Sequence, residues 1–237
     1  MPDVRFAELT VVRHGQSEAN AAFAAAAATG ALDSGITGRD ADVALSPTGR
    51  GQAAALGRWL AGQPAGHRPE AVVCSPYRRA VQTWDLARAA ADGLGVRLPA
   101  ATTDGRLGDR VMGELELLTG AAIAARFPAE AARRRDLGEF RYRPPGGESF
   151  GDIAARLAAV LADLEPRYAG RRVWLVAHDS VVLMLRHLVE GLTFDDLAAV
   201  VAAGPVANAS ITRFRAGLGR PVEYNGVSHL EDGSIQG

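Results

Sequence analysis

The chain has 237 residues, of which 48% are hydrophobic and 22% charged, and its formal net charge is −1. This composition is typical of a soluble globular protein, and the near-zero charge excludes a chain-wide field that would attract nucleic acid or an anionic membrane. The single cysteine, Cys74, excludes an intrachain disulfide. No segment has the pattern of a signal peptide or a membrane span, so we expect a cytoplasmic protein.

The first predicted strand is the apolar run at residues 9–12, which ends abruptly at Arg13, His14 and Gly15. A continuous apolar, β-branched run of this length is typical of a buried strand in a parallel sheet. Ligands of open α/β sheets bind beyond the carboxyl ends of the strands, so Arg13 and His14 are expected at the functional edge. Gly15 would let the backbone turn sharply and approach a ligand closely.

An alanine-rich tract follows at residues 21–28, where the composition favours a helix and suggests a surface insertion. Residues 29–42 are rich in Gly, Asp and Thr and predict a loop long enough to cover a site. Ser46 and Pro47 then predict the start of a helix, which Gly62 would end.

A second apolar run at residues 71–74 predicts another buried strand, and Ser75 is expected to cap the helix after it. Arg78 and Arg79 fall in the first turn of that helix, where positive charge opposes the helix dipole. An anion bound at this N-terminus would offset the penalty.

Carboxyl groups that could exchange protons come next, at Asp109, Glu114 and Glu116. Helices are predicted at residues 117–127 and 129–137, divided by Pro128. Ser149 is predicted to cap a further helix with a continuous apolar face.

The third apolar run, residues 173–177, ends at His178 and Asp179, and Ser180 is expected to cap the next helix. Residues 205–214 predict a later strand, and the tail from Gly226 is expected to be peripheral. Strands alternating with helices predict one α/β domain over residues 1–237, with helices on both faces of a largely parallel sheet.

The pattern Arg13-His14-Gly15-x-Ser17-x-x-Asn20 resembles the RHG motif of the histidine phosphatase superfamily, in its phosphoglycerate-mutase-like branch. Four later blocks are similar to those of the same family and occur in the expected order: Asp42-x-x-Leu45-Ser46-x-x-Gly49, Ser75-Pro76 with its following arginines, Leu107-x-Asp109-x-x-x-Gly113, and Pro145-Gly146-Gly147-Glu148-Ser149. The resemblance implies a three-layer α/β/α sandwich of the phosphoglycerate-mutase-like fold.

The resemblance also implies roles for individual residues. His14 would be the nucleophile that forms a phosphohistidine, and Arg13, Arg78 and His178 would hold the phosphoryl group. The third block resembles the family pattern Ser-Pro-x-x-Arg-Ala-x-x-Thr, whose phosphate-binding arginine is matched to Arg78, so Arg79 is expected at the surface. Asp109 stands where the family has a glutamate proton donor and is one methylene shorter, so Glu114 is kept as an alternative acid. Further residues expected to contact the phosphate are Gln16, Ser17, Asn20 and Asp179.

The chemistry implied is hydrolysis of the phosphomonoester of a small metabolite, without metal or other cofactor. Two alternatives stay open: a phosphoglycerate mutase, and a catalytically inactive protein that binds a phosphorylated ligand. A metal site built from His14, Asp109, His178 and Asp179 is disfavoured because the neighbouring arginines would repel a cation. We expect no nucleic-acid or membrane partner, and the sequence leaves monomer and homodimer open.

Overall fold

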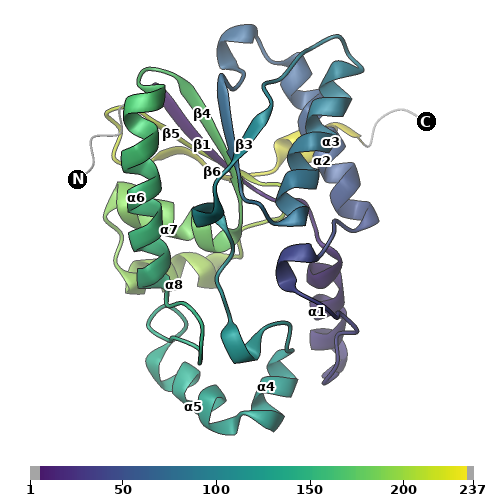
Figure 1. Cartoon of the computed structure of the whole chain (residues 1–237), viewed down its shortest axis with the longest axis vertical. Coiled ribbons are helices and arrows are strands. Elements are labelled where there is room, and N and C mark those ends of the chain that lie inside the picture. The colour runs from purple at the N-terminus through teal and green to yellow at the C-terminus, as the bar shows by residue number, and fades with distance from the viewer. Residues whose placement is uncertain (1–5, 234–237) are drawn as a thin grey trace.

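The computed structural model describes residues 6–233, and within them six strands form one sheet in the order β3-β2-β4-β1-β5-β6 (Figure 1). Their bounds are β1 Glu8–Arg13, β2 Ala71–Cys74, β3 Ala101–Thr103, β4 Arg172–Ala177, β5 Ile211–Arg215 and β6 Pro221–Gly226. The pairs β1/β4, β4/β2 and β2/β3 are parallel, and only β5 and β6 add antiparallel pairing. The prediction of a largely parallel sheet is confirmed.

Helices cover both faces of the sheet, as predicted (Figure 1). On one face α2 (Pro47–Gly62) and α3 (Arg78–Asp92) pack over Val12, Val72 and Trp174. On the other, α6 (Phe150–Tyr168) and α7 (Asp179–Glu190) enclose a second core with Val11 and Leu175. Successive β1 residues thus enter opposite cores, because side chains alternate along a strand, and the three-layer sandwich is confirmed.

The remaining helices gather beyond the carboxyl edge of the parallel strands. They are α1 (Glu18–Thr29), α4 (Gly120–Arg126), α5 (Pro128–Leu137) and α8 (Phe194–Ala203). Pro128 divides α4 from α5 as expected, and the alanine-rich tract forms most of α1. This arrangement places α1 and α4 at the end of the sheet where the chemistry-bearing residues emerge (Figure 1). No helix within residues 6–233 is both long and apolar enough to cross a bilayer.

Two predicted caps are confirmed and two are wrong. Ser46 and Ser149 each accept a hydrogen bond from the backbone of their helix's first turn. In contrast, α3 begins after Tyr77 and α7 begins directly after His178, so neither Ser75 nor Ser180 is an N-cap. Both of these hydroxyls are used in the site described below.

The C-terminal part differs from prediction in two ways. The later strand begins at Ile211, because residues 205–210 form a loop, and β6 was not predicted. The tail is not peripheral throughout: His229 is buried and lies beside Trp59, with ring centroids 5.8 Å apart. Burial lowers the pKa of His229, as expected for an imidazole removed from water.

Candidate active site

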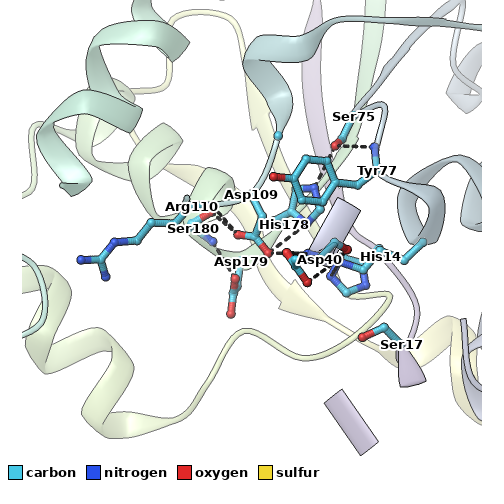
Figure 2. Close-up of polar contacts among 12 residues, drawn as sticks. His14, Ser17, Asp40, Ser75, Tyr77, Asp109, Arg110, His178, Asp179 and Ser180 are labelled. Carbon is cyan, nitrogen blue, oxygen red and sulfur yellow. Dashed lines mark hydrogen bonds and ion pairs between the residues drawn. The ribbon is translucent and has the colours of Figure 1, made fainter. Parts of the chain in front are cut away.

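The parallel strands bring three chain segments to one edge of the sheet. His14 follows β1, Ser75 follows β2 and His178 follows β4. Figure 2 shows these residues converging with Asp40 and Asp109, which come from loops. The rings of His14 and His178 meet edge to face, with centroids 5.1 Å apart. Two of the predicted site residues are thus in contact.

His14 is oriented as a neutral base. Its Nδ1 lies 2.7 Å from the carbonyl oxygen of Gly15, which can only accept, so Nδ1 carries the hydrogen. The lone pair is therefore on Nε2, which accepts from Arg79 Nε at 3.2 Å. Burial, with the charges of His178, Arg79 and Arg13, holds the pKa of His14 well below its usual range. A neutral imidazole with an accessible Nε2 is suited to nucleophilic attack.

Packing against α2 requires a glycine at position 15. A Cβ at position 15 would lie 2.7 Å from the carbonyl oxygen of Gly49, in the first turn of α2. A Cβ at Gly49 would lie 2.0 Å from the carbonyl oxygen of Gln16. The two glycines let the turn that follows β1 pack directly against α2. This contact fixes the backbone that carries His14.

The arginine that enters the site is Arg79, and the prediction for Arg78 is wrong. Arg79 is 3% exposed, whereas Arg78 points to solvent. The cause is a register error: in a Ser-Pro-x-x-Arg pattern that starts at Ser75, the arginine falls at position 79. The expectation that Arg79 is a surface residue is wrong for the same reason.

Two carboxylates hold the guanidinium of Arg79. Its Nη1 donates to Asp40 Oδ1 at 3.0 Å and to the Asp40 carbonyl oxygen at 2.7 Å. Its Nη2 donates to Asp40 Oδ2 and to Asp109 Oδ2, both at 2.9 Å. This planar fork is the geometry that arginine uses for carboxylate and phosphate groups. Asp40 lies at the end of the predicted loop, so this loop does reach the site.

Asp109 is fixed as an ionised carboxylate. Its Oδ1 accepts from Ser180 Oγ and from the Arg110 backbone N–H, both at 2.8 Å. Burial alone would raise the pKa of Asp109, but the contacts with His178 and Arg79 hold this pKa well below its usual range. The carboxyl group is therefore deprotonated while Arg79 is its partner.

His178 is wholly buried and braced by residues after β2. Its Nε2 lies 2.9 Å from Ser75 Oγ, which itself accepts from the Tyr77 backbone N–H at 3.3 Å. Its Nδ1 lies 3.2 Å from Asp109 Oδ2 but has no aligned hydrogen bond. The Tyr77 ring packs against the imidazole, with centroids 4.9 Å apart. That nitrogen is buried, and His178 is not among the residues that line the cavity described below.

Arg13 enters the site beside His14. Its Nη1 donates to the Val206 carbonyl oxygen, and its Nη2 forms an ion pair with Asp179 at 3.5 Å. Its Nε has no hydrogen-bond partner. Both Arg13 and Asp179 line the cavity described below.

The other predicted phosphate contacts divide. Ser17 and Asn20 line the cavity, although their side chains also cap α1 reciprocally. Gln16 does not line it: its side chain accepts from Ser46 Oγ at 2.7 Å and its backbone N–H donates to Gln52. Gln16 therefore joins the turn after β1 to α2 and lies outside the residues that line the cavity.

The alternative acid lies outside the site. Glu114 is exposed and is not among the residues that line the cavity, whereas Asp109 lines it. Glu116 does line the cavity, and its Oε1 accepts from the Asp40 backbone N–H at 3.1 Å. Geometry thus favours Asp109 over Glu114 as the proton donor.

The cavity itself has a volume of about 700 Å³. Its floor carries Arg13, His14, Arg79 and Asp109, and its walls come from α1, α4, α7, α8 and the chain around residues 110–118. This volume is within the range of ordinary small-molecule sites.

Three of the site's groups also have the spacing of metal ligands. His14, Asp109 and His178 each offer one ligand atom, and these atoms lie within 4.8 Å of one another. Arg79, however, donates to both His14 and Asp109. The fourth residue of the predicted metal set, Asp179, pairs with Arg13. Two guanidinium groups among the donors disfavour a divalent cation, because like charges repel at this range.

Sequence reasoning missed several residues that hold the site together. Asp40 and Tyr77 stand in segments without a periodic signal, and Ser75 and Ser180 were interpreted as helix caps. Asn208 was also missed: its Nδ2 donates to the His14 carbonyl oxygen at 3.3 Å and to Asn20 Oδ1 at 3.1 Å. Only Ser75 and Ser180 carried a usable signal, because Ser75 directly follows β2 and Ser180 lies two residues after His178, which follows β4.

The chain is similar to known phosphatases and mutases. It is 34% identical over 219 residues to a glucosyl-3-phosphoglycerate phosphatase of Mycobacterium tuberculosis, covering 89% of this chain and 86% of the relative. It is 33% identical over 188 residues to a 2,3-bisphosphoglycerate-dependent phosphoglycerate mutase of Methylobacterium radiotolerans, covering 78% and 80%.

Solved structures agree with this picture. A mycobacterial glucosyl-3-phosphoglycerate phosphatase in complex with inorganic phosphate has 28% identity and a TM-score of 0.68, over 94% of this chain and 98% of that one. The family model of the histidine phosphatase superfamily (branch 1) matches residues 9–225. The chain therefore belongs to the histidine phosphatase superfamily.

Proposed function

We propose that this protein hydrolyses a phosphomonoester of a small metabolite through a phosphohistidine at His14. The observation that carries the proposal is the environment of His14 Nε2. It is a buried, unprotonated nitrogen that faces the guanidinium of Arg79, with Arg13 and His178 beside it. Cations around a nucleophile stabilise the charge that gathers on the phosphoryl oxygens during transfer.

In the first step His14 Nε2 attacks phosphorus and the bond from phosphorus to the alcohol oxygen breaks. The incoming phosphoryl oxygens take hydrogen bonds from Arg79 and from His178 Nδ1, both of which contact Asp109 beforehand. Losing these partners raises the pKa of Asp109, because the opposite charges that favoured its ionised form now face the phosphate. The protonated Asp109 then donates to the leaving alkoxide.

In the second step the Asp109 carboxylate removes a proton from water, which attacks phosphorus as the bond to Nε2 breaks. Ser180 holds the carboxyl group in place through Oδ1, leaving Oδ2 for proton exchange. The products are inorganic phosphate and the free enzyme. The carboxyl group's two roles are the reverse of one another, as covalent catalysis by two steps requires.

A mutase is the second candidate, because several relatives are phosphoglycerate mutases. A mutase would return the phosphoryl group from His14 to another hydroxyl of the substrate instead of to water. Hydrolysis is favoured because relatives named as phosphatases match a larger share of this chain.

The test is to trap the covalent intermediate and follow its fate. Protein mixed with a ³²P-labelled phosphomonoester and quenched in base should carry acid-labile label on wild type and none on His14→Asn. Labelled protein left unquenched in buffer should release inorganic phosphate. When 2- or 3-phosphoglycerate is added as an acceptor, transfer of the label to it would identify a mutase. Label on wild type and His14→Asn alike would refute the role of His14.

A further inference from the structure

Beyond the floor formed by Arg13, His14, Arg79 and Asp109, apolar side chains line part of the cavity wall. Phe23 of α1, Met112, Leu118, Leu183 of α7 and Val201 of α8 all line it. They come from four separate segments that surround the carboxyl edge of the sheet (Figure 1). We call this part the apolar chamber.

Several of these side chains are not fully buried against protein. Val201 is 38% exposed, and Phe23, Met112 and Leu118 are half-buried. Apolar groups that share one cavity lose free energy when an apolar ligand replaces the water between them. The chamber is thus suited to receive apolar surface.

Two arginines of the chamber wall, Arg110 and Arg134, are paired with Glu139. Arg110 donates to Glu139 at 2.5 Å, to the Tyr142 carbonyl oxygen at 2.6 Å and to the Glu148 carbonyl oxygen at 2.9 Å. Arg134 donates to the other oxygen of Glu139. Because these three side chains satisfy one another, this side of the chamber offers few polar contacts to a substrate hydroxyl, and a hydroxyl buried there without a partner would cost free energy.

We infer that the alcohol part of the substrate is a bulky, predominantly apolar group that fills this chamber. The inference rests on the proposed hydrolysis for the position of the phosphate. It distinguishes this chain's preferred substrate from a polyhydroxylated ester such as glucosyl-3-phosphoglycerate, named for its relatives.

A series of n-alkyl phosphates tests the chamber, because ethyl, butyl and hexyl phosphate share one leaving-group chemistry and differ only in apolar surface. We expect kcat/KM to rise about fourfold for each methylene that is buried, and hexyl phosphate to exceed glycerol 1-phosphate and glucosyl-3-phosphoglycerate. A flat dependence on chain length, or preference for either polar ester, would overturn the inference.

Matched variants locate the effect. Val201→Ser should lower kcat/KM for hexyl phosphate about threefold and leave ethyl phosphate within twofold, since the change removes apolar contact. Val222→Ser on β6 is the control: Val222 is 44% exposed and does not line the cavity. Equal effects of the two variants would contradict the assignment of the chamber.

Binding of the non-hydrolysable ethyl- and hexylphosphonates, measured by calorimetry, separates this inference from the proposed function. If hexylphosphonate binds more tightly than ethylphosphonate and Val201→Ser weakens that binding, the chamber is supported. If, in addition, no ester is turned over, the proposed hydrolysis is refuted and the chamber is not. Turnover with equal affinity for both phosphonates would retain hydrolysis and refute the chamber.

Discussion

Asp40 forms hydrogen bonds with Arg79, the arginine that we propose binds the phosphoryl group. Removing the negative charge of Asp40 should therefore strengthen phosphate binding. Its two carboxylate oxygens and its carbonyl oxygen all accept from Arg79. A bound phosphate would share that guanidinium with the Asp40 carboxylate. Two like charges about 4 Å apart repel by roughly 1 kcal/mol in water and roughly 4 kcal/mol near a protein surface.

Asp40 is partly exposed, with 23% of its side chain accessible, so the lower part of that range applies. Asp40→Asn should therefore lower the inhibition constant of inorganic phosphate about tenfold, which corresponds to about 1.4 kcal/mol. The amide and the unchanged carbonyl oxygen keep acceptors for Arg79, so the side chain stays in place. The assay is competitive inhibition of phosphomonoester hydrolysis by phosphate.

The control is Asp42→Asn, in the same short helical turn (Asp40–Asp42), because Asp42 pairs with Arg39 at the surface instead. Its inhibition constant should stay within twofold of wild type. If Asp40→Asn raises the constant for phosphate and lowers kcat, Asp40 serves to position Arg79, and the argument from repulsion is refuted.

Arg79→Lys should lower kcat/KM about 10²- to 10³-fold, because the fork of donors is lost. Arg78→Lys should keep kcat/KM within twofold of wild type. Equal effects of the two variants in steady-state kinetics would contradict the assignment of Arg79, rather than Arg78, to the site. Asp109→Asn should slow alkyl phosphates about 100-fold or more and affect the first, burst step of 4-nitrophenyl phosphate much less, since nitrophenolate leaves without a proton; the same pattern from Glu114→Gln would move the acid to Glu114. Extensive dialysis against EDTA should leave turnover unchanged, and restoration of lost activity by one divalent metal would establish the metal site instead. The pKa of His14 in the folded protein lies well below 6.5, so below pH 6.5 the unfolded chain binds a proton at His14 that the folded protein does not. The free energy of unfolding should therefore drop by at most about 1.4 kcal/mol per pH unit as the pH falls. Urea titrations at pH 7.5 and 5.5 should show a smaller drop for His14→Asn than for wild type.

The predictable part of the fold is the part that local signals specify. Apolar runs identified β1, β2 and β4, and Ser46 with Pro47 identified the start of α2. β6 escaped because it is an edge strand whose residues are mostly half-buried, so it lacks a continuous apolar run. The loop at residues 205–210 was interpreted as strand because it runs directly into β5, although Pro205, Asn208 and Ser210 are residues typical of turns.

The predictable part of the site is the set of residues that end the strands. Arg13, His14 and His178 were placed correctly because their position follows from the sheet alone. The contacts of Asp40 and Asn208 depend on how loops fold back over 39 and 194 residues of sequence, respectively. Such contacts carry no periodicity, so sequence patterns could not reveal them. Arg79 was different, since its position was legible and was misassigned by one residue.

The central position of β1 determines when the catalytic centre can exist during synthesis. β1 is made long before its partners β4 and β5, which begin at Arg172 and Ile211. The His14 carbonyl oxygen is held by the Ala209 backbone N–H at 3.0 Å. A nascent chain that ends before β4 lacks both neighbours of β1, and one that ends before about residue 215 lacks β5. In either case an apolar edge of β1 stays exposed. Such non-local pairing slows folding, so β1 must wait until both β4 and β5 have been made before activity can appear.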